Sequence, residues 1–178
     1  MSNLDLASLL ARRKALSEKV LVQKAGEYAT AHDRLHNFRR AQGILPFKMS
    51  MICDAFLTKH LVSLLDLHDS VKTVPQEVID EKIGDSVNYI ILKSAIIHEE
   101  NGLNEWPCTN TTFNENFALV FDLAEKYLAS DHGPFPDFTE IVTRAIVGRP
   151  YHYASHDAAR FIVWLVSLEQ EFMMRMRA

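Results

Sequence analysis

Two carboxylates and a carboxamide recur along one side of a predicted helix over residues 78–97. At about 100° per residue, Glu81, Asp85 and Asn88 fall in line at intervals of four and three residues. Leu92 continues this line, so the acids lie at the edge of an apolar surface. Carboxylates in such surroundings usually have a cation as partner, and a divalent metal ion is one candidate. A solvated polar face is the other explanation of the same spacing.

A second polar line runs along the preceding predicted helix, residues 47–69. Lys59 and Asp66 belong to it, while the apolar side of the helix is expected to include Phe56 and Leu65. The connection to the next helix is short and contains a proline. The two helices are therefore expected to form an antiparallel pair with neighbouring ends.

Four acids are expected near the turn of this pair. Asp66 and Asp69 come from the first helix, and Asp80 and Glu81 from the second. Hard divalent cations select carboxylate oxygens, and bound phosphates supply further ligands. The sequence therefore predicts a Mg²⁺ (or Mn²⁺) site at this end of the pair.

The elements that position these residues are all predicted to be helices. Apolar residues recur at helical spacing in about six segments, and the alternation typical of strands is absent, so the fold class is all-α, an antiparallel helical bundle. The first helix is capped by Asp5 or Ser2, reaches towards Tyr28, and carries Arg12 and Arg13 on its polar face. Asp137 and Ser155 are the expected caps of two later helices. We expect a single domain with a helical core over residues 1–98, a loop over 99–112, and additional helices over 113–178 that pack on the core or form an oligomer contact.

Composition excludes several classes of function. The formal net charge is −4 and the pI is about 6.0, which argues against a surface that binds duplex nucleic acid. No apolar run approaches the length of a membrane span, and the first residues do not form a secretory signal. Cys53 and Cys108 do not form a C-x-x-C pair, which favours reduced thiols and a cytoplasmic location, in the host cell if the chain is phage-encoded.

The segment D-E-K-I-G-D-S-V-N-Y resembles the third-helix motif of the MazG-like all-α NTP pyrophosphohydrolase superfamily. Residues 24–98 are more similar still to small phage-encoded helical proteins of nucleotide metabolism. The residues that carry this similarity are, in chain order, Tyr28, His32, Arg34, Asn37, Phe38, Pro46, Lys59, His60, Asp85 and Tyr89.

The resemblance implies a metal-dependent nucleoside triphosphate pyrophosphohydrolase that acts on a (deoxy)nucleotide, with Mg²⁺ or Mn²⁺ as cofactor and with no membrane partner. In this interpretation Glu81 and Asp85 are catalytic and share the metal with two acids of the preceding helix. The full sets are Asp66, Asp69, Glu81 and Asp85 for the metal; Arg34, Lys59 and Lys82 for phosphates; and His32, Asn37, Asn88 and Tyr89 for the base or sugar.

The sequence departs from the family pattern at two places. Lys82 stands where the family has a second glutamate, and Asp66 with Asp69 replaces an E-x-x-E pair. These changes favour an alternative, a non-catalytic protein that binds and sequesters a nucleotide or a nucleotide signal. A helical structural, virion or interaction protein is a second alternative. Separately, the alternative to phosphate binding for Arg34 and Lys59 is that they only pair with acids across the helix interface. A homo-oligomer, dimer or tetramer, is expected from the resemblance.

The histidines allow two further interpretations. An HD-type phosphohydrolase uses separated His and Asp residues, and His32, His68, Asp69 and Asp122 occur in that order. The segment Y-H-Y-A-S-H-D, residues 151–157, could bind a metal ion through its histidines and aspartate. Three His-Asp dipeptides in one chain show how readily the pair arises without a function, and histidines near a helix N-terminus are the commoner explanation of the second pattern.

Overall fold

The computed structural model describes residues 5–30, 32–70, 74–103, 107–147 and 154–177, and the side chains of 22–28, 69, 70, 142, 145–147, 154 and 177 are not among those described. Within these ranges the protein is all-α, as predicted, and contains no named strand. Seven helices are present there: α1 (Leu6–Tyr28), α2 (His36–Gln42), α3 (Met49–Ser70), α4 (Gln76–Glu100), α5 (Asn110–Ala129), α6 (Phe138–Val147) and α7 (Ala154–Arg177).

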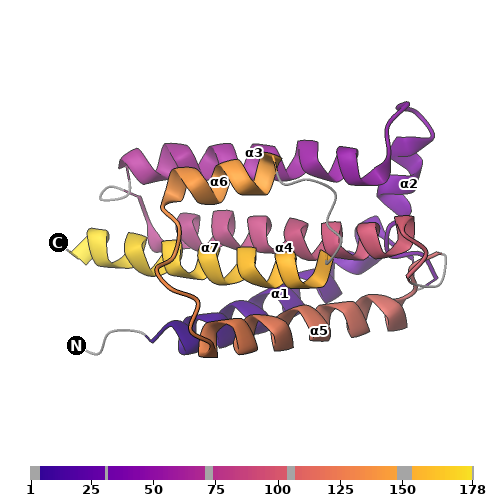
Figure 1. Ribbon diagram of the computed structural model, residues 1–178. Helices are drawn as coiled ribbons and strands as arrows, with labels where there is room; N and C mark the ends of the chain where they lie inside the picture. The colour runs from indigo at the N-terminus through magenta and orange to yellow at the C-terminus, as the bar shows by residue number, and fades with distance from the viewer. Residues whose placement is uncertain (1–4, 31, 71–73, 104–106, 148–153, 178) are drawn as a thin grey trace.

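The long helices run side by side in a bundle (Figure 1). α3 packs along α4, and α2 lies against the beginning of α3. α7 contacts α4, α5, α1 and α6, so the C-terminal helix is a central element of the bundle. The additional helices therefore pack on the predicted core instead of standing apart from it.

About half of the α4 side chains are buried. The apolar side predicted from its spacing is confirmed, since Ile79, Ile83 and Val87 are fully buried and Ile90 and Ile97 nearly so. These residues join a hydrophobic cluster that draws on all seven helices. Burial of this apolar surface is the main force that holds the bundle together.

An ionic network crosses the core between α1, α4 and α7. Arg13 is 1% exposed and Glu169 is fully buried, and Nη2 of Arg13 donates to Oε1 of Glu169 at 2.7 Å and to Oδ1 of Asp80 at 2.8 Å. Arg12 contacts both acids as well. The prediction that Arg13 lies on a solvated face was wrong, because two acids from distant helices pair with it.

Four local boundaries show how the helices begin. Asp5 accepts a hydrogen bond from the amide of Ala7, and Asp137 accepts one from the amide of Glu140, so both predicted caps are confirmed. Ser155 lies inside α7, where its hydroxyl contacts Nε2 of His98 at 2.8 Å, so it is not a cap. α5 begins within the predicted loop, because Thr109 accepts from the amide of Thr112 and caps the helix early.

None of the helices in the described ranges is both long enough and apolar enough to cross a membrane.

Candidate functional site

The α3–α4 pair brings an imidazole, a carboxylate and a phenol ring together at its surface. Nδ1 of His60 lies 3.4 Å from Oδ2 of Asp85. The His60 ring stacks on Tyr89, with centroids 4.9 Å apart and planes inclined by 27°. Asp85 and Tyr89 are four residues apart on α4, so both side chains project from the same side of that helix towards α3. We call this group and its charged neighbours the His60 site.

Charged side chains from both helices surround the His60 ring. Burial lowers the pKa of His60 below its ordinary value of 6.5, and the negative charge of Asp85 opposes this effect. The positive charges of Lys59 and Lys82 lower the pKa further, while Glu81 raises it. All four groups therefore act on one imidazole, which gives the site two cations and two anions.

Aromatic rings continue the site towards α2. Phe56 lies one helical turn before His60, and its ring centroid is 6.0 Å from that of Tyr89 and 6.3 Å from that of Phe38. Phe56 was expected on the buried side of its helix but is 47% exposed, and Leu65 is likewise 38% exposed. The exposed ring of Phe56, three residues before Lys59 on α3, offers a flat apolar surface at this end of the site.

The predicted metal ligands whose side chains are described lie in different surroundings. Glu81 is exposed and forms an ion pair of 2.9 Å with its neighbour Lys82, and Asp85 faces His60. Asp66 is exposed farther along α3, and the side chain of Asp69 lies outside the described residues. Asp80, expected near the same turn, instead belongs to the arginine network in the core.

No three His, Cys, Asp or Glu side chains in the described part of the chain lie close enough together to hold a metal ion. As placed, Asp66, Glu81 and Asp85 therefore do not fit a divalent cation by themselves. The four-carboxylate set with Asp69 stays a prediction.

Arg34, predicted to bind phosphate with Lys59 and Lys82, makes its described contacts elsewhere. Its Nη2 donates to the carbonyl of Leu21 at 3.2 Å, and its guanidinium carbon lies 4.7 Å from the centroid of the Phe113 ring. Burial lowers the pKa of Arg34, with a smaller opposing effect from Cys108. The guanidinium thus packs between α1 and α5, whereas the two lysines lie at the His60 site.

The predicted base-binding residues divide between surface and interior. His32 and Asn37 are exposed, and Asn37 precedes Phe38 in α2, next to the aromatic end of the site. Asn88 is only 7% exposed, and its side-chain carbonyl accepts no hydrogen bond from the described residues. Tyr89 lies half-buried in the ring stack. Of these four, Tyr89 is the residue that the structure places against His60.

His60 and Phe56 had no assigned role in the sequence-based prediction of the site. The K-H dipeptide at residues 59 and 60 was part of the quoted motif, and this was the available signal for His60. Phe56 carried no such signal, since an aromatic residue at helical spacing ordinarily belongs to the core.

The structure also shows where His68 and Asp122, two residues of the HD-type interpretation, lie. His68 stacks on Phe138 with centroids 4.9 Å apart, while Asp122 lies 3.9 Å from the ammonium group of Lys14. These contacts give His68 and Asp122 separate surroundings. His152, in the other interpretation, lies outside the described residues.

The His60 site can bind an anion through two lysines and can stack a planar ring on Phe56. Both capacities come from side chains of α3 and α4, which the long interface between these helices holds in place. Comparison of the chain with protein-family models, with curated proteins and with solved structures finds no match.

Proposed function

We propose that this protein binds a nucleotide at the His60 site. The observation that carries the proposal is that the charges of Lys59 and Lys82 both act on His60, which lies one helical turn from the exposed ring of Phe56. The lysines supply positive charge for phosphates, and the ring of Phe56 supplies a surface for a base. Asp85 is an acceptor for a hydroxyl or an exocyclic amine, and Asn37 adds an amide at the α2 end.

Metal-dependent pyrophosphohydrolysis is the second candidate, and it is favoured by the resemblance of the α4 motif to MazG-like enzymes. Glu81 and Asp85 are the carboxylates in reach of a phosphate held by Lys59 and Lys82. The described carboxylates do not fit a metal ion without a further ligand, and therefore binding is the function that the geometry supports best. The cytoplasm is the expected location of either activity.

Calorimetry with a panel of NTPs, dNTPs and monophosphates, with and without Mg²⁺, tests the proposal, and pyrophosphate release is followed in the same samples. Phe56→Ala is expected to weaken binding by about tenfold through loss of base stacking. Lys59→Met and Lys82→Met should weaken the binding of triphosphates more than that of monophosphates. Lys126 is an exposed lysine on α5, and Lys126→Met should change the affinity for neither. Pyrophosphate release with Mg²⁺ would support the second candidate, and no binding of any nucleotide would overturn both.

The outer face of α3 supports the expectation of a homo-oligomer. Five of its residues follow the 4-3-4-3 spacing of a coiled-coil seam. Ala55 is exposed, Thr58 is half-buried, and Met51, Val62 and Leu65 are 53%, 45% and 38% exposed. We call this set the α3 seam: Met51, Ala55, Thr58, Val62 and Leu65. α3 lies at one edge of the bundle, where another chain can approach (Figure 1).

The charges beside the seam suit an antiparallel arrangement of two copies. Lys59 and Asp66 are exposed and lie seven residues apart, at equivalent positions of successive heptads. In an antiparallel pair, Lys59 would face Asp66 of the partner subunit, and the two-fold axis would repeat this ion pair on the other side. A second copy of this chain is therefore the occupant that we propose for the seam, in a homodimer.

A further inference from the structure

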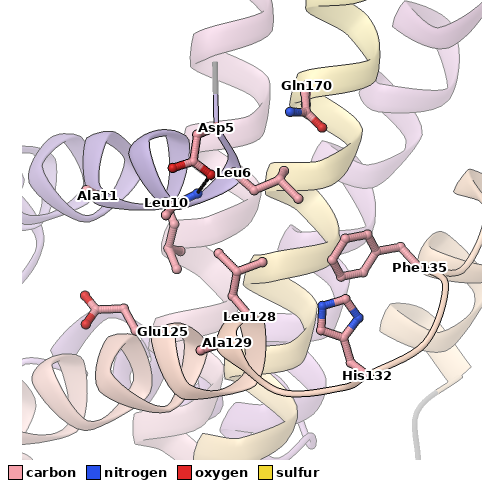
Figure 2. A pocket seen from close by; sticks show the side chains of 11 residues that line it. Asp5, Leu6, Leu10, Ala11, Glu125, Leu128, Ala129, His132, Phe135 and Gln170 are labelled. Carbon is pink, nitrogen blue, oxygen red and sulfur yellow. Dashed lines mark hydrogen bonds between the residues drawn. The ribbon is translucent and has the colours of Figure 1, made fainter. Parts of the chain in front are cut away.

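A pocket separate from the His60 site opens at the end of the bundle where α1 begins and α5 ends (Figure 2). Its volume is about 910 Å³, within the range of pockets that hold small molecules. Leu6 and Leu10 come from α1, Leu128 from α5, and Phe135 from the connection between α5 and α6. Figure 2 shows Leu6, Leu128 and Phe135 directed towards a common space. The interior of this α1–α5 pocket is thus apolar.

The formal charges in the lining are both negative. Asp5 and Glu125 lie at the rim, and no lysine or arginine is among the described residues that line the pocket. One oxygen of Asp5 accepts from the amide of Ala7, which leaves the other available. The ammonium group of Lys14 is 3.6 Å from Glu125 and 3.9 Å from Asp122, so one cation is shared between two acids. The rim therefore carries excess negative charge.

His132 contributes both a ring and a hydrogen-bond acceptor. Its Nδ1 lies 2.7 Å from the carbonyl oxygen of Gly133, and because a carbonyl only accepts, Nδ1 carries the hydrogen. In the neutral ring Nε2 is then an acceptor. The ring stacks on Phe135 with centroids 4.4 Å apart, and it lies 5.2 Å from the ring of Tyr127. Aromatic faces of this kind attract cations.

Gly133 shapes this wall of the pocket. Its φ of +67° lies in the left-handed region, which glycine adopts without the steric cost that other residues incur. The turn brings His132 and Phe135 face to face at the mouth of the pocket.

We propose that the α1–α5 pocket binds a small organic cation with an apolar body, an aliphatic or aromatic amine. The apolar body lies against Leu6, Leu128 and Phe135, and the ammonium group faces the rim formed by Asp5 and Glu125. An anionic ligand of the same shape meets two carboxylates, and a neutral one lacks the attraction between its charge and those carboxylates.

The test compares four probes of equal chain length: octylamine, octyltrimethylammonium, octanol and octanoate. Calorimetry and thermal shift on the full chain should show the two cations binding more tightly than octanol, and octanoate binding least. Because each carboxylate is partly exposed, Asp5→Asn and Glu125→Gln should each lower the affinity for the two cations by up to about fivefold. The affinity for octanol should not change. Asparagine keeps the cap of α1, so that Asp5→Asn retains the fold.

Asp122→Asn is the matched control, because Asp122 shares Lys14 with Glu125 but does not line the pocket. It should lower the affinity for octylamine less than Glu125→Gln does, because Lys14 then interacts with Glu125 alone but both lining carboxylates remain. Equal affinity for octylamine and octanoate, or for octylamine in wild type and in the Asp5→Asn, Glu125→Gln double variant, would overturn the proposal. Neither result depends on nucleotide binding at the His60 site.

Discussion

His60 is the residue on which the electrostatics of the α3–α4 surface converge. Its pKa is lowered first by burial and then by Lys59 and Lys82, against the opposing charge of Asp85. The ring is consequently mostly neutral at pH 7, and the two lysines supply the positive charge of the site. A neutral ring stacked on Tyr89 also keeps one nitrogen as an acceptor.

The lowered pKa of His60 predicts a dependence of stability on pH. The unfolded chain binds a proton at His60 more readily than the folded chain, so the free energy of unfolding should fall as the pH drops below about 6.5 towards the folded-state pKa. His60→Gln removes this contribution. Urea unfolding between pH 5 and pH 8, about 1.5 units either side of the ordinary histidine pKa, should show that the free energy of unfolding declines less steeply with falling pH in the variant than in the wild type.

His156→Gln, a substitution of an exposed histidine on α7, controls for the loss of one imidazole. Its decline should match that of the wild type. Parallel curves for wild type and His60→Gln would show that the folded environment does not disfavour the charged ring, and would contradict the assignment of the His60 surroundings.

The spacing of residues along single helices predicted much of this molecule. It predicted the helical class, the buried side of α4 and the caps at Asp5 and Asp137, because each depends on contacts within a few residues. It assigned Arg13 to a solvated face, since charged side chains are ordinarily exposed. The partner that buries Arg13 is Glu169, 156 residues later, and no local pattern reports a contact at that separation.

The same limit applies to the candidate site. Lys59, Lys82 and Asp85 lie together because α3 and α4 are neighbours in sequence and antiparallel, which a short connection predicts. Arg34 precedes α2, in a stretch without helical spacing, and its contact with Phe113 depends on how α5 packs. Residues on adjacent elements could therefore be grouped from the sequence, whereas those that depend on distant elements could not.

The ionic network between α1, α4 and α7 predicts a large effect for one substitution. Glu169→Gln leaves the guanidinium of Arg13 buried with less compensating charge, so the free energy of unfolding should fall by about 3–5 kcal/mol. The double variant Arg13→Met, Glu169→Leu replaces the pair by apolar side chains and should recover much of that loss. Urea unfolding measures both, with Arg160→Ala on the exposed face of α7 as the control.

A double variant as unstable as Glu169→Gln would show that the network contributes through more than the avoidance of an unpaired charge.

Asp80 belongs to the same network. Burial would raise the pKa of Asp80, but hydrogen bonds from Arg12 and Gln76 and the nearby positive charges outweigh it and lower the pKa. The contribution of Asp80 is therefore present above its ordinary pKa and is lost in acid.

As a whole, the molecule presents two surfaces that its core does not use, the α3 seam and the α1–α5 pocket. The seam lies on α3 beside the His60 site, and Lys59 of that site flanks the seam. The pocket is formed by α1, α5, the connection that follows α5, and Gln170 of α7, away from α3. Pairing of two copies through the seam would thus leave the pocket open.

Pairing through the α3 seam predicts that one charge next to the two-fold axis separates the subunits. Val62→Glu should yield monomers in sedimentation velocity, because two like charges would meet near the two-fold axis, whereas Leu119→Glu on α5, equally exposed at 45%, should leave the dimer intact. Lys59→Asp should weaken the dimer, and adding Asp66→Lys should restore it by reversing both ion pairs. Wild-type protein that sediments as a monomer at its highest soluble concentration, or a dimer unaffected by Val62→Glu, would contradict this arrangement.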